Sequence, residues 1–368
     1  MAMTIKKTCD VDGIAAILEK RLAGERLTRD DGLHLLASDD ILALGAAAHA
    51  VKRRHSGEQV FFNVNCHLNL TNICAARCPL CAFSCDAHAS NAYCMDQQEA
   101  VERVRAAGEG VTEIHMVSAL HPGKPFSYYL DMVRCLHRAF PQMHIKAFTA
   151  AEIHYFAQIA GCSVTSVLSS LKEAGLGSLP GGGAEVLSDR VRAGICPHKA
   201  SAAEWLAVMR TAHALGLKSN ATLLFGHIET AGEIIDHLLS LRSLQDETAG
   251  FQVFIPLPFH PENTVFADRA IRPTAVEILR MISVGRLMLD NFEHVKAYWV
   301  MTGVPVAQLA LVFGADDIDG TVLEEKITHA AGATTATGLG RDTLIEVIRQ
   351  SSSRPVERDS LYQVLRRY

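Results

Sequence analysis

The sequence predicts an α/β protein built as a (β/α)8 TIM-type barrel, with helices before the barrel and a helical cap after it. Two observations support this class. From residue 60 onward, short β-rich runs alternate with helical stretches about eight times. Polar residues also stand at the ends of nearly every run, where a barrel builds its active site. An open doubly wound sheet is the alternative, but no glycine-rich dinucleotide fingerprint follows the first run.

Each predicted strand is a short apolar run with β-branched or aromatic residues. The runs are VFFNVN (60–65), EIHMVSA (113–119), HIKAFT (144–149), residues 177–179, SNATLLF (219–225), GFQVFIP (250–256), VKAYWV (295–300) and LALVFG (309–314). Helical patterns separate them, most clearly at residues 96–108, 127–140, 201–216 and 230–245.

The chain divides into three predicted parts. Residues 1–55 form an N-terminal helical segment, in which Thr28 and Ser38 each precede an apolar-periodic run and so are expected N-caps. Residues 56–316 form the barrel. Residues 317–368 return to helical patterning, which predicts a C-terminal helical cap over the barrel.

Composition excludes several classes of protein. The chain has 368 residues, 49% of them hydrophobic, which is ample for a large core. The formal net charge of −5 argues against a nucleic-acid partner. The longest apolar stretches fall short of the roughly 18 residues that span a bilayer, and no apolar region of a secretory signal follows the first lysines. We therefore expect a cytoplasmic protein, in which the ten cysteines do not form a disulfide framework and the clustered ones serve metal or redox chemistry.

The stretch 72-NICAARCPLCAFSC-85 places Cys74, Cys78, Cys81 and Cys85 within twelve residues. The spacing C-x3-C-x2-C after a strand suits a [4Fe–4S] cluster held by three thiolates, which leaves one iron open to chelate S-adenosylmethionine. Zinc is an alternative, but it usually needs a second C-x2-C knuckle. A closed cluster with Cys85 as the fourth ligand and a set of inert buried thiols are the others. We favour the open cluster, with Cys85 and Cys94 as spectators.

Several longer segments resemble the radical S-adenosylmethionine superfamily, and within it the menaquinone (futalosine-pathway) and deazaflavin branch. The resemblance covers about residues 60 to 365. It lies in 65-NCHLNLTNICAARCPLCAFS-84, 142-QMHIKAFTAAEI-153, 179-LPGGGAEVL-187, 191-VRAGICPHK-199, 218-KSNATLLFGHIE-229, 242-RSLQDETAGFQVFIPLPFHPENT-264, 320-GTVLEEKITHAAGA-333 and 354-RPVERDSLY-362. Within that branch the chain is most similar to the aminofutalosine synthases, through KSNATLLFGHIE and FQVFIPLPFHPENT.

The resemblance implies an alkyl-transfer type of transferase reaction in menaquinone biosynthesis. The 5′-deoxyadenosyl radical of S-adenosylmethionine adds to 3-[(1-carboxyvinyl)oxy]benzoate, decarboxylation follows, and 6-amino-6-deoxyfutalosine forms. A low-potential electron donor of the flavodoxin or ferredoxin type is implied as a partner. One alternative is the sibling dehypoxanthine futalosine cyclase. Another is a non-catalytic iron–sulfur or zinc protein, which would use four ligands.

The resemblance also assigns cofactor residues. It makes Cys74, Cys78 and Cys81 the catalytic cluster ligands. The residues expected to contact S-adenosylmethionine are Leu80, Ser118, Ala119, His121, Glu185, Arg192, Asn220 and Thr222. Ser118-Ala119 stands where the branch usually has Gly-Gly, so any backbone conformation there with positive φ is in doubt. Asn220 and Thr222 share one face of their strand because side chains alternate.

The implied substrate is a dicarboxylate, which needs cationic or hydrogen-bonding partners. The residues expected to bind it are His67, Asn69, Lys146, His227, Glu229 and His260. Lys146 lies in an otherwise apolar strand, where a lysine is rarely neutral filler. The alternative for Lys146 is a structural ion pair with Glu152 or Glu185.

Overall fold

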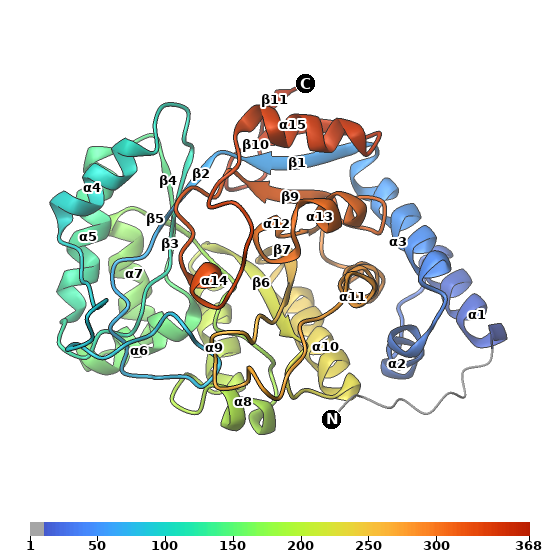
Figure 1. The fold of residues 1–368 in the computed structure, drawn as a ribbon, viewed down its shortest axis with the longest axis horizontal. Helices are drawn as coiled ribbons and strands as arrows, with labels where there is room; N and C mark the ends of the chain where they lie inside the picture. The colour runs from blue at the N-terminus through green and yellow to red at the C-terminus, as the bar shows by residue number, and fades with distance from the viewer. Residues whose placement is uncertain (1–10) are drawn as a thin grey trace.

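A curled sheet of parallel strands forms the centre of the computed structural model, which describes residues 11–368 (Figure 1). Strands that follow one another along the chain are neighbours in this sheet, in the order β2 to β8. The strands are β2 Asn65–Leu68, β3 Glu113–Met116, β4 His144–Ala147, β5 Leu176–Leu179, β6 Lys218–Phe225, β7 Phe251–Pro258 and β8 His294–Val295. The predicted TIM-type β/α architecture is confirmed, with seven parallel strands in a curled half-barrel rather than eight.

Helices connect these strands and cover the outside of the sheet (Figure 1). They are α4 Gln97–Ala106, α5 Phe126–Ala139, α6 Ala150–Ala160, α7 Val164–Ala174, α8 Asp189–Ile195, α9 Ala202–Ala214, α10 Ala231–Thr248 and α11 Ala275–Met288. Capping boxes begin α6, α9, α10 and α11, in which a threonine or serine and the glutamate three residues later satisfy each other's backbone N–H groups. Because such a box fixes where a helix starts, it also fixes the loop that precedes the helix.

A second sheet lies beside the first and has the order β11-β10-β1-β9. Its strands are β1 Gln59–Asn63, β9 Asp317–Gly320, β10 Arg354–Arg358 and β11 Val364–Arg367. The predicted strand at 60–65 is therefore two strands. Its first part belongs to the second sheet, and the central sheet begins only at Asn65.

The segment after β8 closes the gap that the seven strands leave. Asp317 forms a parallel bridge with Lys296, just after β8, and Leu323 forms one with Cys66 in β2. Residues 317–323 thus occupy the place expected of an eighth strand. The strand predicted at 309–314 is wrong, because that stretch is the end of helix α13 Val304–Ala310 and the turn after it. Pro305 at the start of α13 favours a helix there.

The N-terminal helices α1 Val11–Leu22, α2 Arg29–Ala37 and α3 Ile41–Ser56 are as predicted, although residues 1–10 lie outside the described part. Thr28 is confirmed as an N-cap with a capping box. Ser38 instead ends α2, and Asp40 caps α3. Helix α3 packs against α11, so this segment lies against the barrel (Figure 1). In the part of the chain that the structure describes, no helix is long and apolar enough to cross a membrane.

The C-terminal part is mixed rather than only helical. Besides the short helix α14 Ile327–Ala330 and the helix α15 Arg341–Gln350, it supplies β9, β10 and β11; the short helix α12 Trp299–Thr302 precedes it. Because β1 lies between β9 and β10, residues 317–368 share a sheet with the segment before the barrel. The division at 1–55, 56–316 and 317–368 stays a prediction.

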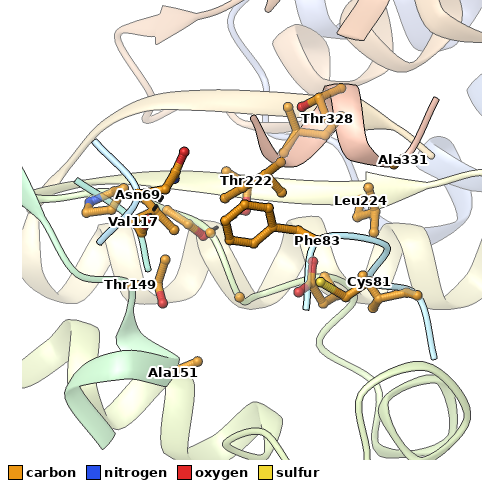
Figure 2. Close-up of a pocket in the computed structure, with 18 of the residues that line it drawn as sticks. Asn69, Cys81, Phe83, Val117, Thr149, Ala151, Thr222, Leu224, Thr328 and Ala331 are labelled. Atoms are coloured by element: carbon orange, nitrogen blue, oxygen red, sulfur yellow. Dashed lines mark hydrogen bonds between the residues drawn. The ribbon is translucent and has the colours of Figure 1, made fainter. Parts of the chain in front are cut away.

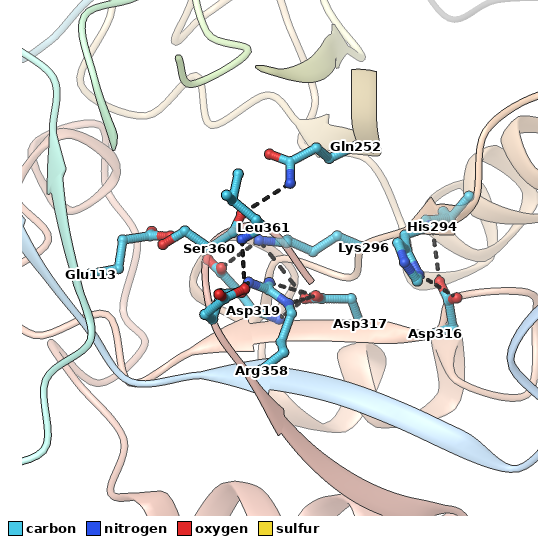
Figure 3. A network of polar contacts seen from close by, with 12 residues as sticks. Glu113, Gln252, His294, Lys296, Asp316, Asp317, Asp319, Arg358, Ser360 and Leu361 are labelled. Atoms are coloured by element: carbon cyan, nitrogen blue, oxygen red, sulfur yellow. Dashed lines mark hydrogen bonds and ion pairs between the residues drawn. The ribbon is translucent and has the colours of Figure 1, made fainter. Parts of the chain in front are cut away.

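Buried ion pairs hold β9 and the residue before it against neighbouring elements (Figure 3). Arg286 of α11 donates to Asp316 at 2.7 Å, and Lys296 donates to Asp319 at 2.6 Å. Arg358 of β10 donates to Asp317 at 2.8 Å through Nε. A buried charge without its partner is costly, so these contacts hold β9 in one register.

Replacement of Asp316 by alanine is expected to lower the free energy of unfolding by about 3–5 kcal/mol, because it leaves the Arg286 guanidinium buried without a carboxylate. The two side chains are 1% and 0% exposed. A denaturant titration measures the loss. Asp236→Ala, which breaks the exposed pair with Arg29, is the control and is expected to match the wild type. An equal loss of unfolding free energy in the two variants would contradict the inference that the buried pair of Arg286 and Asp316 stabilises the fold.

Candidate functional site

A cavity of about 320 Å³ opens at the carboxyl ends of the central strands (Figure 2). Many residues singled out from the sequence line it. They are His67, Asn69, Cys74, Cys78, Leu80, Cys81, Ser118, Ala119, Glu185, Asn220, Thr222 and His260. In Figure 2, Asn69 and Val117 lie at one side and Cys81 at the other, while Thr328 and Ala331 face Thr149 and Ala151 across the space.

The cysteine loop follows β2 and is held at both ends. The Cys74 N–H donates to the Cys85 carbonyl at 3.2 Å, and the Cys85 N–H donates to the Asn72 carbonyl at 2.9 Å. Between these contacts the chain presents Cys74, Cys78 and Cys81 to the cavity. Cys85 serves the loop through its backbone and does not line the cavity.

These thiols fit an iron–sulfur cluster better than one zinc ion. All three are free. Within residues 11–368, no three His, Cys, Asp or Glu side chains are gathered closely enough to share a single metal ion. A cluster makes no such demand, since each thiolate binds a different iron. Cys94 is directed elsewhere, with its sulfur 3.5 Å from the Tyr128 hydroxyl.

The loop after β3 needs no glycine. Neither Ser118 nor Ala119 has a positive φ. The Ser118 hydroxyl accepts a hydrogen bond from the Thr71 N–H at 3.2 Å, and the Ala119 N–H donates to the Thr71 carbonyl at 3.2 Å. The Ala75 N–H also donates to the Leu120 carbonyl at 2.8 Å. The Ser-Ala sequence therefore ties this loop to the cysteine loop.

Glu152 lines the cavity and was not predicted as a site residue. It is 2% exposed, and its carboxylate accepts hydrogen bonds from the backbone N–H groups of Ser118 and Thr149, each at 2.8 Å, and from the Thr149 hydroxyl. Burial raises the pKa of this carboxyl to about 7. The capping-box pattern at Thr149–Glu152 could be recognised in the sequence. The hydrogen bond between Glu152 and Ser118, in the loop after β3, could not.

Glu185 and Lys199 form an ion pair of 2.8 Å in the wall. Burial opposes ionisation of Glu185, but Lys199 outweighs it and lowers the pKa of the carboxyl; Glu185 in turn raises the pKa of Lys199. The pair lines the same cavity as the cysteines, and the charge of Lys199 opposes the rise that burial causes in the pKa of the Cys78 thiol.

Strand β6 contributes Asn220 and Thr222 to the cavity, and both are buried. The Thr222 hydroxyl donates to the Gly181 carbonyl at 2.7 Å. A Cβ on Gly181 would lie 2.7 Å from the Asn220 carbonyl oxygen, so only glycine lets this loop approach the strand.

The opposite end of the cavity, which we call the floor, is formed by His67, His115, Lys296 and Asp319. Only His67 of these was predicted. Lys296 directly follows β8, so its place at a strand end could have identified it as a candidate site residue. Asp319 lies in a strand that the sequence did not predict. His260 also lines the cavity, but both of its ring nitrogens are used: Nε2 donates to the Met301 carbonyl and Nδ1 accepts from Arg272.

Arg192 does not reach the cavity, contrary to its predicted contact with S-adenosylmethionine. Its guanidinium is 4% exposed and donates to the backbone carbonyls of Gly183, Ala184 and Ala200. Those carbonyls use its donors, so the residue fixes the glycine loop that carries Glu185.

Lys146 is also outside the cavity and donates to Glu113 on the neighbouring strand at 2.7 Å, rather than to Glu152 or Glu185. His227 and Glu229 turn toward each other, with 2.8 Å between Nδ1 and the carboxylate and side chains that are 1% and 5% exposed. His121 likewise does not line the cavity, and its Nδ1 accepts from the Gly123 N–H. The structure therefore does not bring these four predicted residues to the cavity.

Comparison with known proteins agrees with this site. The model of the radical SAM superfamily matches residues 68–241, and that of the CofH/MqnC C-terminal region matches residues 248–367. The chain is 46% identical to the aminodeoxyfutalosine synthase of Streptomyces coelicolor, over 97% of this chain and 95% of the relative. It is 44% identical to that of Thermus thermophilus, over 95% of each. It is 36% identical to the cyclic dehypoxanthine futalosine synthase of Streptomyces coelicolor, over 95% of this chain and 88% of the relative.

The fold resembles that of a solved structure, methylornithine synthase (PylB), with a TM-score of 0.68 and 18% identity. The match covers 91% of this chain and 95% of that chain. At this identity the likeness concerns the fold alone.

The environment of Glu152 predicts a pH dependence of stability. Because its folded pKa of about 7 lies above the ordinary 4.5, the folded protein holds this proton more tightly than the unfolded chain does. Its contribution is present below pH 4.5 and is lost as the pH rises toward 7. We therefore expect the unfolding free energy of the wild type, minus that of Glu152→Gln, to fall over this range in denaturant titrations at successive pH values.

The matched control is Glu204, which occupies the same capping-box position in α9 but is half exposed. Bonds from Ser201 lower the pKa of Glu204, so the corresponding difference for Glu204→Gln should not fall with rising pH. A flat difference for Glu152→Gln would contradict the burial argument.

Proposed function

The chain belongs to the radical S-adenosylmethionine superfamily, and we propose that within it the chain acts as an aminodeoxyfutalosine synthase. The observation that carries this proposal is its higher identity, over nearly the whole chain, to two synthases of that name than to the cyclic sibling. The site supports it, because the cavity is large enough for small-molecule ligands and opens beside the three cysteines.

The superfamily uses a [4Fe–4S] cluster and S-adenosylmethionine. Cys74, Cys78 and Cys81 would hold the cluster, and the donor set leaves one iron for the amino acid part of S-adenosylmethionine. When bound, the cluster supplies the electron that splits S-adenosylmethionine. Glu185 lies on this side of the cavity, and its carboxylate is suited to an ammonium or to ribose hydroxyl groups.

Other residues would hold the nucleoside part. Leu80 offers an apolar surface beside the cysteines, and Asn220 offers an amide from β6. Ser118 and Ala119 bring the backbone of the loop after β3 close to the same space. Glu152 holds that loop in place by accepting the Ser118 N–H.

We propose 3-[(1-carboxyvinyl)oxy]benzoate as the second substrate. The 5′-deoxyadenosyl group joins its enol-ether double bond, rearrangement and loss of a carboxylate carbon follow, 6-amino-6-deoxyfutalosine forms, and methionine leaves. Apolar side chains of β6 and β7 suit the ring and limit water near the reacting carbons. They are Leu224, Ile255, Leu257 and, after β7, Phe259.

A low-potential flavodoxin or ferredoxin is the proposed electron donor, and the cytoplasm the proposed location. The cysteines of the described part are all free, as is usual where thiols stay reduced.

Anaerobic reconstitution with iron and sulfide, followed by reduction and addition of both substrates, tests the reaction. Mass spectrometry is expected to detect a product that joins the adenosyl and benzoate parts with one carboxylate carbon lost. Free 5′-deoxyadenosine without an adduct would refute the proposed substrate, and the cyclase substrate would be tried next. Absence of S-adenosylmethionine cleavage by a fully loaded cluster would refute the radical chemistry.

Alanine at Cys74, Cys78 or Cys81 is expected to abolish both the bound cluster and the activity, because each thiolate binds a separate iron. Iron content and the EPR signal of the reduced cluster measure this independently of turnover. Cys85→Ala is the matched control in the same loop and should keep the cluster, since Cys85 acts through its backbone. Loss of the cluster in Cys85→Ala would show that Cys85 is a ligand.

A further inference from the structure

Two histidines lie face to face on the cavity floor. His67 of β2 and His115 of β3 are register partners in the parallel sheet. Their rings are stacked, with centroids 4.4 Å apart and planes 10° apart. Both line the cavity, so a ligand that reaches the floor meets this pair.

The fixed charges around the pair are already matched. Lys296 donates to Asp319 at 2.6 Å. Below the floor, Lys146 is bound to Glu113, and Arg358 to Asp317. Each of these cations has a carboxylate partner, so an anion added at the floor would find no spare lysine or arginine among these pairs.

The histidines are the groups that can change their charge. The buried Nε2 of His67 has no hydrogen-bond partner among the described residues. Burial, together with His115 and Lys296, lowers the pKa of His67 to about 3, although Asp319 and Glu113 act in the opposite direction. His115 has its own carboxylate neighbour, with Nδ1 3.6 Å from Glu113. Without ligand, His67 is therefore neutral near pH 7.

The floor and the cysteines mark two different ends of the cavity. Lys199, paired with Glu185, acts on the Cys78 thiol and so belongs to the cysteine end. The charged groups that act most strongly on His67 are His115, Asp319, Glu113 and Lys296. Asn69, two residues after His67, lies across the cavity from Cys81 (Figure 2).

The chemistry of the proposed substrate selects which of its carboxylates reaches the floor. One carboxylate is attached to the reacting double bond, which must meet the adenosyl group near the cysteines. The other is attached to the far side of the benzoate ring. Only the second can extend away from the reacting carbons to the histidine pair.

Resting on the proposed function, we infer that His67 and His115 bind the benzoate carboxylate and take up one proton as it binds. Lys296 is the neighbouring cation, still paired with Asp319. The matched ion pairs offer no spare positive charge to the substrate carboxylate. The added proton supplies that charge and makes His67 Nε2 a charged hydrogen-bond donor. Substrate affinity then falls as the pH rises through the pKa of the histidine pair in the complex.

Calorimetry tests this inference with anaerobic, cluster-loaded enzyme and S-adenosylmethionine, titrated with 3-[(1-carboxyvinyl)oxy]benzoate. Titrations at pH 7.5 in buffers of different ionisation enthalpy report the number of protons taken up, expected to be about one. The analogue with a carboxamide in place of the benzoate carboxylate should bind at least about tenfold more weakly, with uptake near zero, because it forms no charged hydrogen bond.

Variants separate binding from folding. His67→Gln and His115→Gln are expected to lose proton uptake and to raise KM for the benzoate substrate at least about tenfold. The EPR signal of the cluster and the KM for S-adenosylmethionine should stay unchanged. His144→Gln is the matched control, because this half-buried strand histidine bonds to Ser178 and does not line the cavity; it should keep both proton uptake and KM.

The outcomes distinguish this inference from the proposed function. If the wild type forms no adduct, the proposed function fails. If it forms the adduct but takes up no proton, or binds the carboxamide analogue equally well, the inference is overturned and the function stands. An unchanged KM in both glutamine variants would overturn it as well.

Discussion

The open side of the seven-stranded sheet is the constraint on which the rest of the structure depends. A parallel sheet that stops before closure leaves the backbone groups of β2 and β8 exposed at its edges. Residues 317–323 fill that gap, because Asp317 pairs with Lys296 on one side and Leu323 with Cys66 on the other. The buried carboxylates of Asp316, just before β9, and of Asp317 and Asp319 in β9 meet Arg286, Arg358 and Lys296 respectively, and a shift of one residue would separate these charges.

This closure gives the cavity its floor, and short local contacts give it the remaining sides. The cysteine loop is bound to the loop after β3 through Thr71 and Ala75. Segment α14 covers the cavity from above and is tied to the barrel by the Asn263 side chain, which donates to the Ala330 carbonyl at 2.9 Å. The Thr335 hydroxyl donates to the Val300 carbonyl on the same side. The cavity is therefore enclosed by segments from the early and the late part of the chain.

The features that could be predicted from the sequence are those that local residue patterns determine. The alternation of strands and helices gave the TIM-type class, and the cysteine spacing gave the loop that lines the cavity. It could not predict which sheet a strand joins: VFFNVN reads as one strand, although its first residues pair with β9 and β10. Nor could it show whether a polar side chain at a strand end points into the cavity. Arg192 looked suited to a carboxylate, but nearby backbone carbonyls take its donors.

The two ends of the cavity differ in the charged groups that line them. Near the cysteines, burial opposes ionisation of Glu185 but Lys199 lowers the pKa of this carboxyl, and the resulting carboxylate suits a ligand with a sulfonium and an ammonium. At the floor, Lys296 and the neighbouring cations are paired with carboxylates that hold β9 in place. Breaking these pairs to bind a substrate carboxylate would weaken the closure of the sheet. In the proposed binding mode, His67 avoids this conflict, because it is neutral without a ligand and gains a proton only when an anion binds. In the proposed reaction, the charges at the two ends of the cavity orient the two ligands, and the ion pairs of the fold stay intact.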